Sequence, residues 1–210
     1  PSWRHWMREL TDGRQLLRYD HRGGGLSDRR APLSFEAEVE DVEAVVDAAG
    51  LDRFDLLGLS AGAGVAVAYT VRHPERVRRL VLLGGFPFGW KVSASPEHVA
   101  RRQAMLTLTY DGWDADNPAF RQMFTSLFLP DGSPEEQRWF TEMQRTTISG
   151  EALCAYQLVG AEVVDAGFDF EEIAVRGRCV VDRGERVEQR GTARERIRER
   201  RADRTHDARF

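Results

Sequence analysis

The sequence contains very little lysine and cysteine. Lys91 is the single lysine, so all but one of the 30 basic residues are arginine, and an arginine by itself says little about binding. The two cysteines, Cys154 and Cys179, are too few for the disulfide framework of a small secreted domain or for a set of metal ligands. We therefore expect a cytoplasmic protein without a bound metal.

Long hydrophobic runs and a strong net charge are also missing. No segment approaches the roughly 18 to 20 apolar residues that a membrane-spanning helix needs, and the run at 80–83 has only the size of a strand. The net charge of −4 and the pI of about 5.8 provide no basic field for nucleic acid. The chain starts at Pro1 without Met or a signal-peptide pattern, and we expect that the natural N-terminus is missing.

The first part of the chain alternates between strand and helix patterns. Short apolar runs predict strands at 15–19, 54–59 and 80–83, and helical spacing predicts helices at 34–49 and 61–72. Ser34 is expected to cap the first of these helices, with acidic residues in its first turn and a glycine after its end. This alternation predicts the α/β class, with a mostly parallel sheet that is covered by helices on both faces.

The remainder of the chain has a different composition. Residues 95–166 are rich in aromatic residues and Met at helical spacing, which predicts a helical cap or lid inserted over a core whose first part is 1–94. Residues 167–210 would return to the core. Because 176–210 contain 12 arginines and few large apolar residues, this last part is expected to be solvated or disordered.

One motif in the sequence indicates a catalytic nucleophile. Gly58, Ser60 and Gly62 form G-x-S-x-G between a predicted strand and a predicted helix, which is the context of a nucleophile elbow. We expect both glycines to be required because side chains there would clash, and we expect the serine to adopt strained backbone angles that expose its hydroxyl. The alternative is a simple tight turn, for instance one that binds phosphate, although neither of the usual phosphate-loop patterns occurs.

Three segments together resemble proteins of the α/β-hydrolase fold, especially the esterase-like and haloperoxidase-like branch. They are YDHRGGGLSD at 19–28, GLSAG at 58–62 and HPERVRRLVLLGG at 73–85. The resemblance implies that Ser60 is the nucleophile and that the backbone N–H of Ala61 is one oxyanion donor. In the family pattern, the second donor comes from a loop that would lie upstream of Pro1.

The resemblance also implies an acid and a histidine after the helical insertion. The segment VRGRCVVDRGERV at 175–187 imitates the family's strand and acid loop, and either Asp182 or Glu185 fits the position of the acid. His206 is the only histidine after them and would be the base. His21 is a candidate to line the site, and it lies in a glycine-rich segment at 20–29, the glycine loop. For each carboxylate, the alternative interpretation is a surface group among arginines.

These observations predict a serine hydrolase that acts on a small ester-like substrate by acyl transfer and needs no cofactor. The alternatives are a non-catalytic, ligand-sensing hydrolase-like module of a regulatory protein, or an inactive fragment. Similar domains are sometimes fused to transcription regulators or nucleotide cyclases, so a fused regulatory domain is a further expectation. We expect neither nucleic acid nor a membrane to be a partner of this domain.

Overall fold

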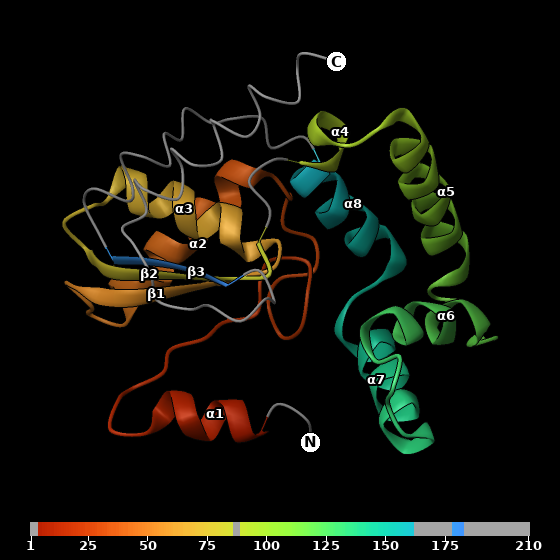
Figure 1. Cartoon of the computed structure of the whole chain (residues 1–210), viewed down its shortest axis with the longest axis horizontal. Helices are drawn as coiled ribbons and strands as arrows, with labels where there is room; N and C mark the ends of the chain where they lie inside the picture. Colours follow the sequence, from red (N-terminus) through yellow and green to blue (C-terminus); the bar gives the residue numbers. More distant parts are fainter. Residues whose placement is uncertain (1–3, 86–88, 162–177, 183–210) are drawn as a thin grey trace, which may run out of the picture.

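A computed structural model describes residues 4–85, 89–161 and 178–182 (Figure 1). The described elements follow one another along the chain as α1 (Arg4–Thr11), α2 (Phe35–Ala48), β1 (Phe54–Leu59), α3 (Gly62–Arg72), β2 (Val77–Leu83), α4 (Trp90–Ser93), α5 (Pro96–Gly112), α6 (Ala119–Phe128), α7 (Pro134–Thr147), α8 (Gly150–Ala161) and β3 (Arg178–Asp182).

The three described strands form one parallel sheet in the order β1-β2-β3. At its carboxyl end, Leu59 of β1 lies beside Leu83 of β2, and Leu83 lies beside Asp182 of β3. The predicted α/β class and parallel pairing are therefore confirmed. The strand expected at 80–83 begins earlier, at Val77, and the apolar run before Asp182 is a strand as expected.

Local sequence explains why α2 and α3 begin and end where they do. The Ser34 side chain accepts a hydrogen bond from the Ala37 N–H at the start of α2, and Gly50 after its end has a φ of +65°. Both are the expected caps, because a serine oxygen satisfies an orphan N–H and glycine tolerates the left-handed conformation. α3 ends before Pro74, which cannot continue a helix.

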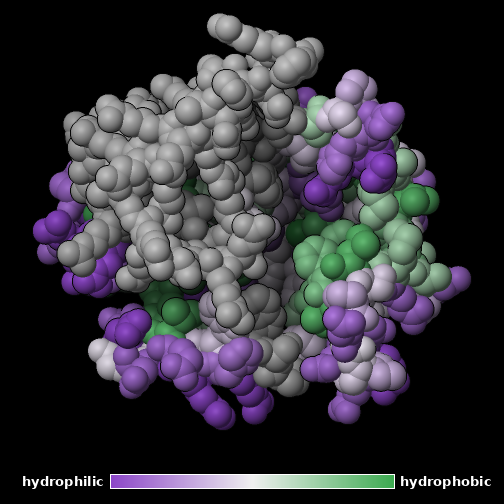
Figure 2. All heavy atoms as spheres, in the orientation of Figure 1, coloured by the Kyte–Doolittle hydropathy of each residue, from purple (hydrophilic) through white to green (hydrophobic). Residues whose placement is uncertain are grey.

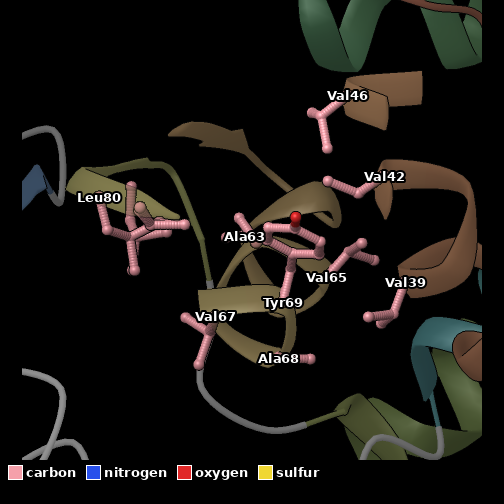
Figure 3. Packing of buried hydrophobic residues seen from close by; sticks show 12 residues of the cluster. Val39, Val42, Val46, Ala63, Val65, Val67, Ala68, Tyr69 and Leu80 are labelled. Atoms are coloured by element: carbon pink, nitrogen blue, oxygen red, sulfur yellow. The ribbon is translucent and has the colours of Figure 1, made fainter. Parts of the chain in front are cut away.

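The main core lies between the sheet and the α2–α3 layer. Val39, Val42 and Val46 point from α2 toward α3, whose Tyr69 is fully buried among them (Figure 3). Alternation along β1 places Phe54 and Leu56 on this side of the sheet. The opposite face of β1 is open: Leu57 and Leu59 expose 40% and 45% of their surface.

The prediction of a strand at 15–19 is wrong. These residues have no regular structure and connect α1, on the other side of the sheet from α2 and α3, to the glycine loop (Figure 1). Leu17 and Tyr19 expose 42% and 44% of their surface. An apolar run becomes a strand only when another strand supplies its hydrogen bonds, and no described strand does so here.

Helices α5 to α8 form a separate group beside the sheet (Figure 1). α6 packs on α7, and α5 packs on α8. The fully buried Trp113, just after α5, donates from its indole Nε1 to the Ile148 carbonyl at 2.9 Å and so ties α5 to the start of α8. Part of the outer surface of this group is hydrophobic (Figure 2). None of the described helices is long and apolar enough to cross a membrane.

Candidate functional site

Ser60 lies in the turn that connects β1 to α3, and its backbone is strained. Its φ of +52° makes it the only non-glycine residue with a positive φ in the described part of the chain. The Ser60 N–H donates to the Leu83 carbonyl at 2.9 Å, and the Ser60 carbonyl accepts from the Ala63 N–H at 3.1 Å. Hydrogen bonds thus fix the backbone N–H and the backbone carbonyl of the strained residue, while its side chain is exposed. This is the geometry that the motif predicts.

Gly58 and Gly62 differ in the space around them. A Cβ on Gly58 would lie 2.8 Å from Ala63 Cα and from Ala66 Cβ, so β1 and α3 could not approach as closely with any side chain there. A Cβ on Gly62 would meet no atom of the described residues within 4 Å. The clash expected at Gly62 is therefore absent. Instead, the sequence motif misses Gly85, where a Cβ would lie 2.4 Å from Ala63 Cβ.

The first turn of α3 presents its backbone N–H groups next to Ser60. Ala61 is the N-cap residue, with φ −59° and ψ −32°, and its N–H has no acceptor among the described residues. The N-terminal end of a helix carries a partial positive charge, so an anion that forms beside Ser60 would be stabilised there. An oxyanion donor needs an N–H group that is close to the nucleophile and has no other acceptor, and the Ala61 N–H meets both conditions among the described residues.

The structure describes one of the three residues that were expected to complete the triad. Asp182 is the last residue of β3 and lies beside Leu83, whose carbonyl accepts from the Ser60 N–H. Asp182 and Ser60 therefore belong to the same carboxyl edge of the sheet, on opposite sides of β2. Glu185 and His206 lie outside the described residues.

His21 is held in the glycine loop and contacts α8. Its ring stacks on Tyr156 with centroids 4.6 Å apart, and its Nδ1 lies 2.6 Å from the Arg22 carbonyl, which requires the proton on Nδ1. The side-chain interactions of His21 between described residues are with Arg22 and Tyr156, and no hydrogen bond or ring contact there joins it to Ser60. No group of three His, Cys, Asp or Glu side chains in the described part could hold a metal ion.

The glycine loop joins the core to the helices beside it, a role that the sequence did not indicate. Gly25 donates its N–H to the Thr147 carbonyl at 2.7 Å, and Gly24 forms an antiparallel bridge with Ile148. Arg29 donates to the Thr146 carbonyl at 2.9 Å. The connection between α7 and α8 is thus fixed to the loop that precedes α2. The run of glycines was the available signal, because it lets two backbones approach closely.

Comparison with known proteins agrees with this architecture. The sequence pattern of the alpha/beta hydrolase fold matches residues 1–133. The chain is 42% identical over 160 residues to 2-hydroxymuconate semialdehyde hydrolase of Pseudomonas sp. strain CF600, covering 66% of this chain and 55% of that protein. It is 38% identical over 86 residues to pyrrolizixenacetamide deacetylase of Xenorhabdus hominickii, covering 40% of this chain and 32% of that protein.

Among solved structures, a hydrolase from Pseudomonas aeruginosa PA01 superimposes with a TM-score of 0.62 at 23% identity, covering 86% of this chain and 65% of that one. At this identity, the similarity shows the fold alone. With the family match, it establishes that the chain belongs to the alpha/beta hydrolase fold family. The chain spans about half the length of the curated relative that it matches over 160 residues.

Proposed function

We propose that the protein is a serine hydrolase in which Ser60 attacks the carbonyl of a small ester-like substrate. The observation that carries this proposal is the backbone of Ser60, a non-glycine residue held at a φ of +52° between a strand and a helix. Such strain costs on the order of 1 to 3 kcal/mol and persists where it serves a purpose. Here it supports the exposure of a hydroxyl at the carboxyl edge of a parallel sheet, where ligands of α/β folds bind.

The proposed reaction is acyl transfer in two steps. A base, for which His206 is the candidate, takes the Ser60 proton while Ser60 Oγ bonds to the carbonyl carbon, and the leaving group departs with that proton. Water then attacks the acyl-serine while the base takes a proton from the water. The bond between Ser60 Oγ and the acyl carbon breaks, the carboxylic acid product leaves, and the base returns the proton to Ser60 Oγ. The Ala61 N–H would stabilise the oxyanion in both steps. Asp182 or Glu185 would orient the base, and the position of Asp182 at the edge next to Leu83 supports its candidacy.

The proposed substrate class is small molecules with an acyl carbonyl next to the bond that is cleaved. The relatives' names support this class, since one is a semialdehyde hydrolase and the other a deacetylase. The two names refer to different molecules, so we propose only the carbonyl centre as the shared feature. Helices α5 to α8 are the proposed lid and pocket wall.

Labelling with a fluorophosphonate probe tests the nucleophile. We expect the protein to be labelled and Ser60→Ala to abolish labelling, because only an activated serine hydroxyl reacts with this phosphorus centre at a useful rate. Ser126→Ala is the matched control, since Ser126 is an exposed serine on α6 and should not affect labelling. Equal labelling of the wild type and Ser60→Ala would disprove the proposal, and no labelling of either would favour the ligand-sensing alternative.

A further inference from the structure

Glu38 is a buried carboxyl without a partner. It lies in the first turn of α2, where an acidic residue usually faces solvent and interacts with the helix dipole. Glu38 instead exposes only 8% of its surface, and its Oε1 has no hydrogen-bond partner in the described part of the chain. Burying an ionised carboxylate without compensation is very costly, so this site favours the protonated acid.

The nearest cation is already occupied by another carboxylate. Arg22 binds Asp41 in a two-bond fork, with Nε 2.7 Å from Oδ2 and Nη2 2.5 Å from Oδ1. Two further N–H groups, one on Nη1 and one on Nη2, donate to the Pro32 and Ala37 carbonyls. Arg22 therefore neutralises Asp41 and only partly offsets the charge that Glu38 would carry.

The groups that interact electrostatically with Glu38 come from different parts of the chain. They are Asp41 of its own helix, Arg22 and Tyr19 of the glycine loop and the segment before it, and Tyr156 of α8. His21, which stacks on Tyr156, is the other titratable ring at this junction. The Arg22–Asp41 pair joins the glycine loop to α2, and the His21–Tyr156 stack joins the same loop to α8, so the charges that act on Glu38 belong to this junction.

We propose that Glu38 is a protonation switch that controls how firmly α8 docks on the core: the neutral acid permits docking, and the ionised carboxylate opposes it. An ionised Glu38 would place a second negative charge beside Asp41 in a poorly solvated junction. Movement of α8 away from the glycine loop would admit water to that charge. Burial above all, with a further contribution from Asp41, raises the pKa of Glu38 to about 7, so the change falls in the physiological pH range.

Amide hydrogen exchange of the intact chain, followed peptide by peptide, tests the switch. After correction for the intrinsic pH dependence of exchange, we expect the opening of α8 (Gly150–Ala161) to increase about tenfold or more between about pH 5.5 and about pH 8. In Glu38→Gln, which keeps the shape and cannot ionise, the opening should be independent of pH. Glu40→Gln, on the exposed side of α2, should behave as the wild type does.

Two results would overturn the proposal. One is a pH dependence of α8 that is the same in the wild type and in Glu38→Gln. The other is a dependence that survives in Glu38→Gln and disappears in His21→Asn, which would make the imidazole the switch. If Glu38→Gln fails to fold, carbon-13 NMR of the wild-type glutamate carboxyls decides the question, because a Glu38 midpoint near about 4.5 rather than 7 would contradict the switch.

Discussion

At the scale of single residues, the β1–α3 turn combines backbone strain with close packing. Ser60 occupies a left-handed conformation that L-residues adopt only at a cost, and Gly58 lets α3 start directly against β1. The sequence predicted both features because strand, turn and helix are consecutive in the chain. It could not predict the open space at Gly62 or the crowding at Gly85, because these depend on the exact approach of β2 and α3.

Adding a methyl group at each motif glycine should therefore have opposite effects. We expect Gly58→Ala to lower the free energy of unfolding by about 1 to 3 kcal/mol, because its Cβ would overlap α3. Gly62→Ala is the matched control, and should leave stability unchanged or raise it by about 0.5 to 1 kcal/mol, because alanine favours a helix. Urea unfolding followed by circular dichroism measures both. Equal losses would show that Gly62 is as crowded as Gly58.

At the scale of elements, the glycine loop is held from two sides. Arg22 anchors it to α2 through Asp41 and two carbonyls, and Gly24, Gly25 and Arg29 bind it to the α7–α8 connection. These hydrogen bonds fix the backbone of the loop in place. Its order depends on directed hydrogen bonds rather than on apolar burial, and Leu26 at its tip is completely exposed.

Arg22→Lys should loosen this loop although it keeps the charge. Lysine cannot form the two-bond fork with Asp41 or reach the Pro32 and Ala37 carbonyls at the same time, so we expect a loss of about 1 to 3 kcal/mol in the free energy of unfolding. Arg72→Lys, in the exposed ion pair with Glu36, should cost clearly less. Urea unfolding of the two variants provides the comparison, and similar losses would argue against a structural role for the fork.

The elements also show how far the sequence can be interpreted. The helix at 34–49 could be predicted, because its cap, its apolar spacing and its terminal glycine all lie within it. The strand at 15–19 could not be assessed in that way, because a strand depends on a neighbour that local sequence does not specify. The burial of Glu38 could not be predicted either, because local sequence does not specify the tertiary packing around the first turn of a helix. Glu185 and His206 remain predictions.

At the scale of the whole molecule, two kinds of carboxyl shape the pH dependence of stability. The pKa values of the exposed Glu36, Glu136 and Glu142 are lowered by hydrogen bonds from Arg72, Ser133 and Arg145. Their contribution is present above their unfolded pKa of about 4.5 and is lost as the pH falls through their folded values. Glu38 acts in the opposite direction, because its folded pKa is raised.

The free energy of unfolding should therefore fall as the pH rises from about 4.5 to about 7. In that window the folded protein retains the Glu38 proton and the unfolded chain does not, a difference equivalent to about 3 kcal/mol. Urea unfolding of the wild type and of Glu38→Gln across this range checks the sign, and the variant should show a much smaller slope. The assignment would be refuted if the free energy of unfolding rose over this pH range in the wild type and in Glu38→Gln alike.

The open face and outer edge of β1 also affect how this chain behaves in solution. Because β1 is one of the two edge strands of the described sheet and Leu57 and Leu59 are exposed on it, the backbone there can pair with extended segments from other molecules. We therefore expect dynamic light scattering to show self-association that grows with protein concentration. A charged replacement at Leu57, which lies away from the core, is the simplest way to improve shelf life without altering the Ser60 turn.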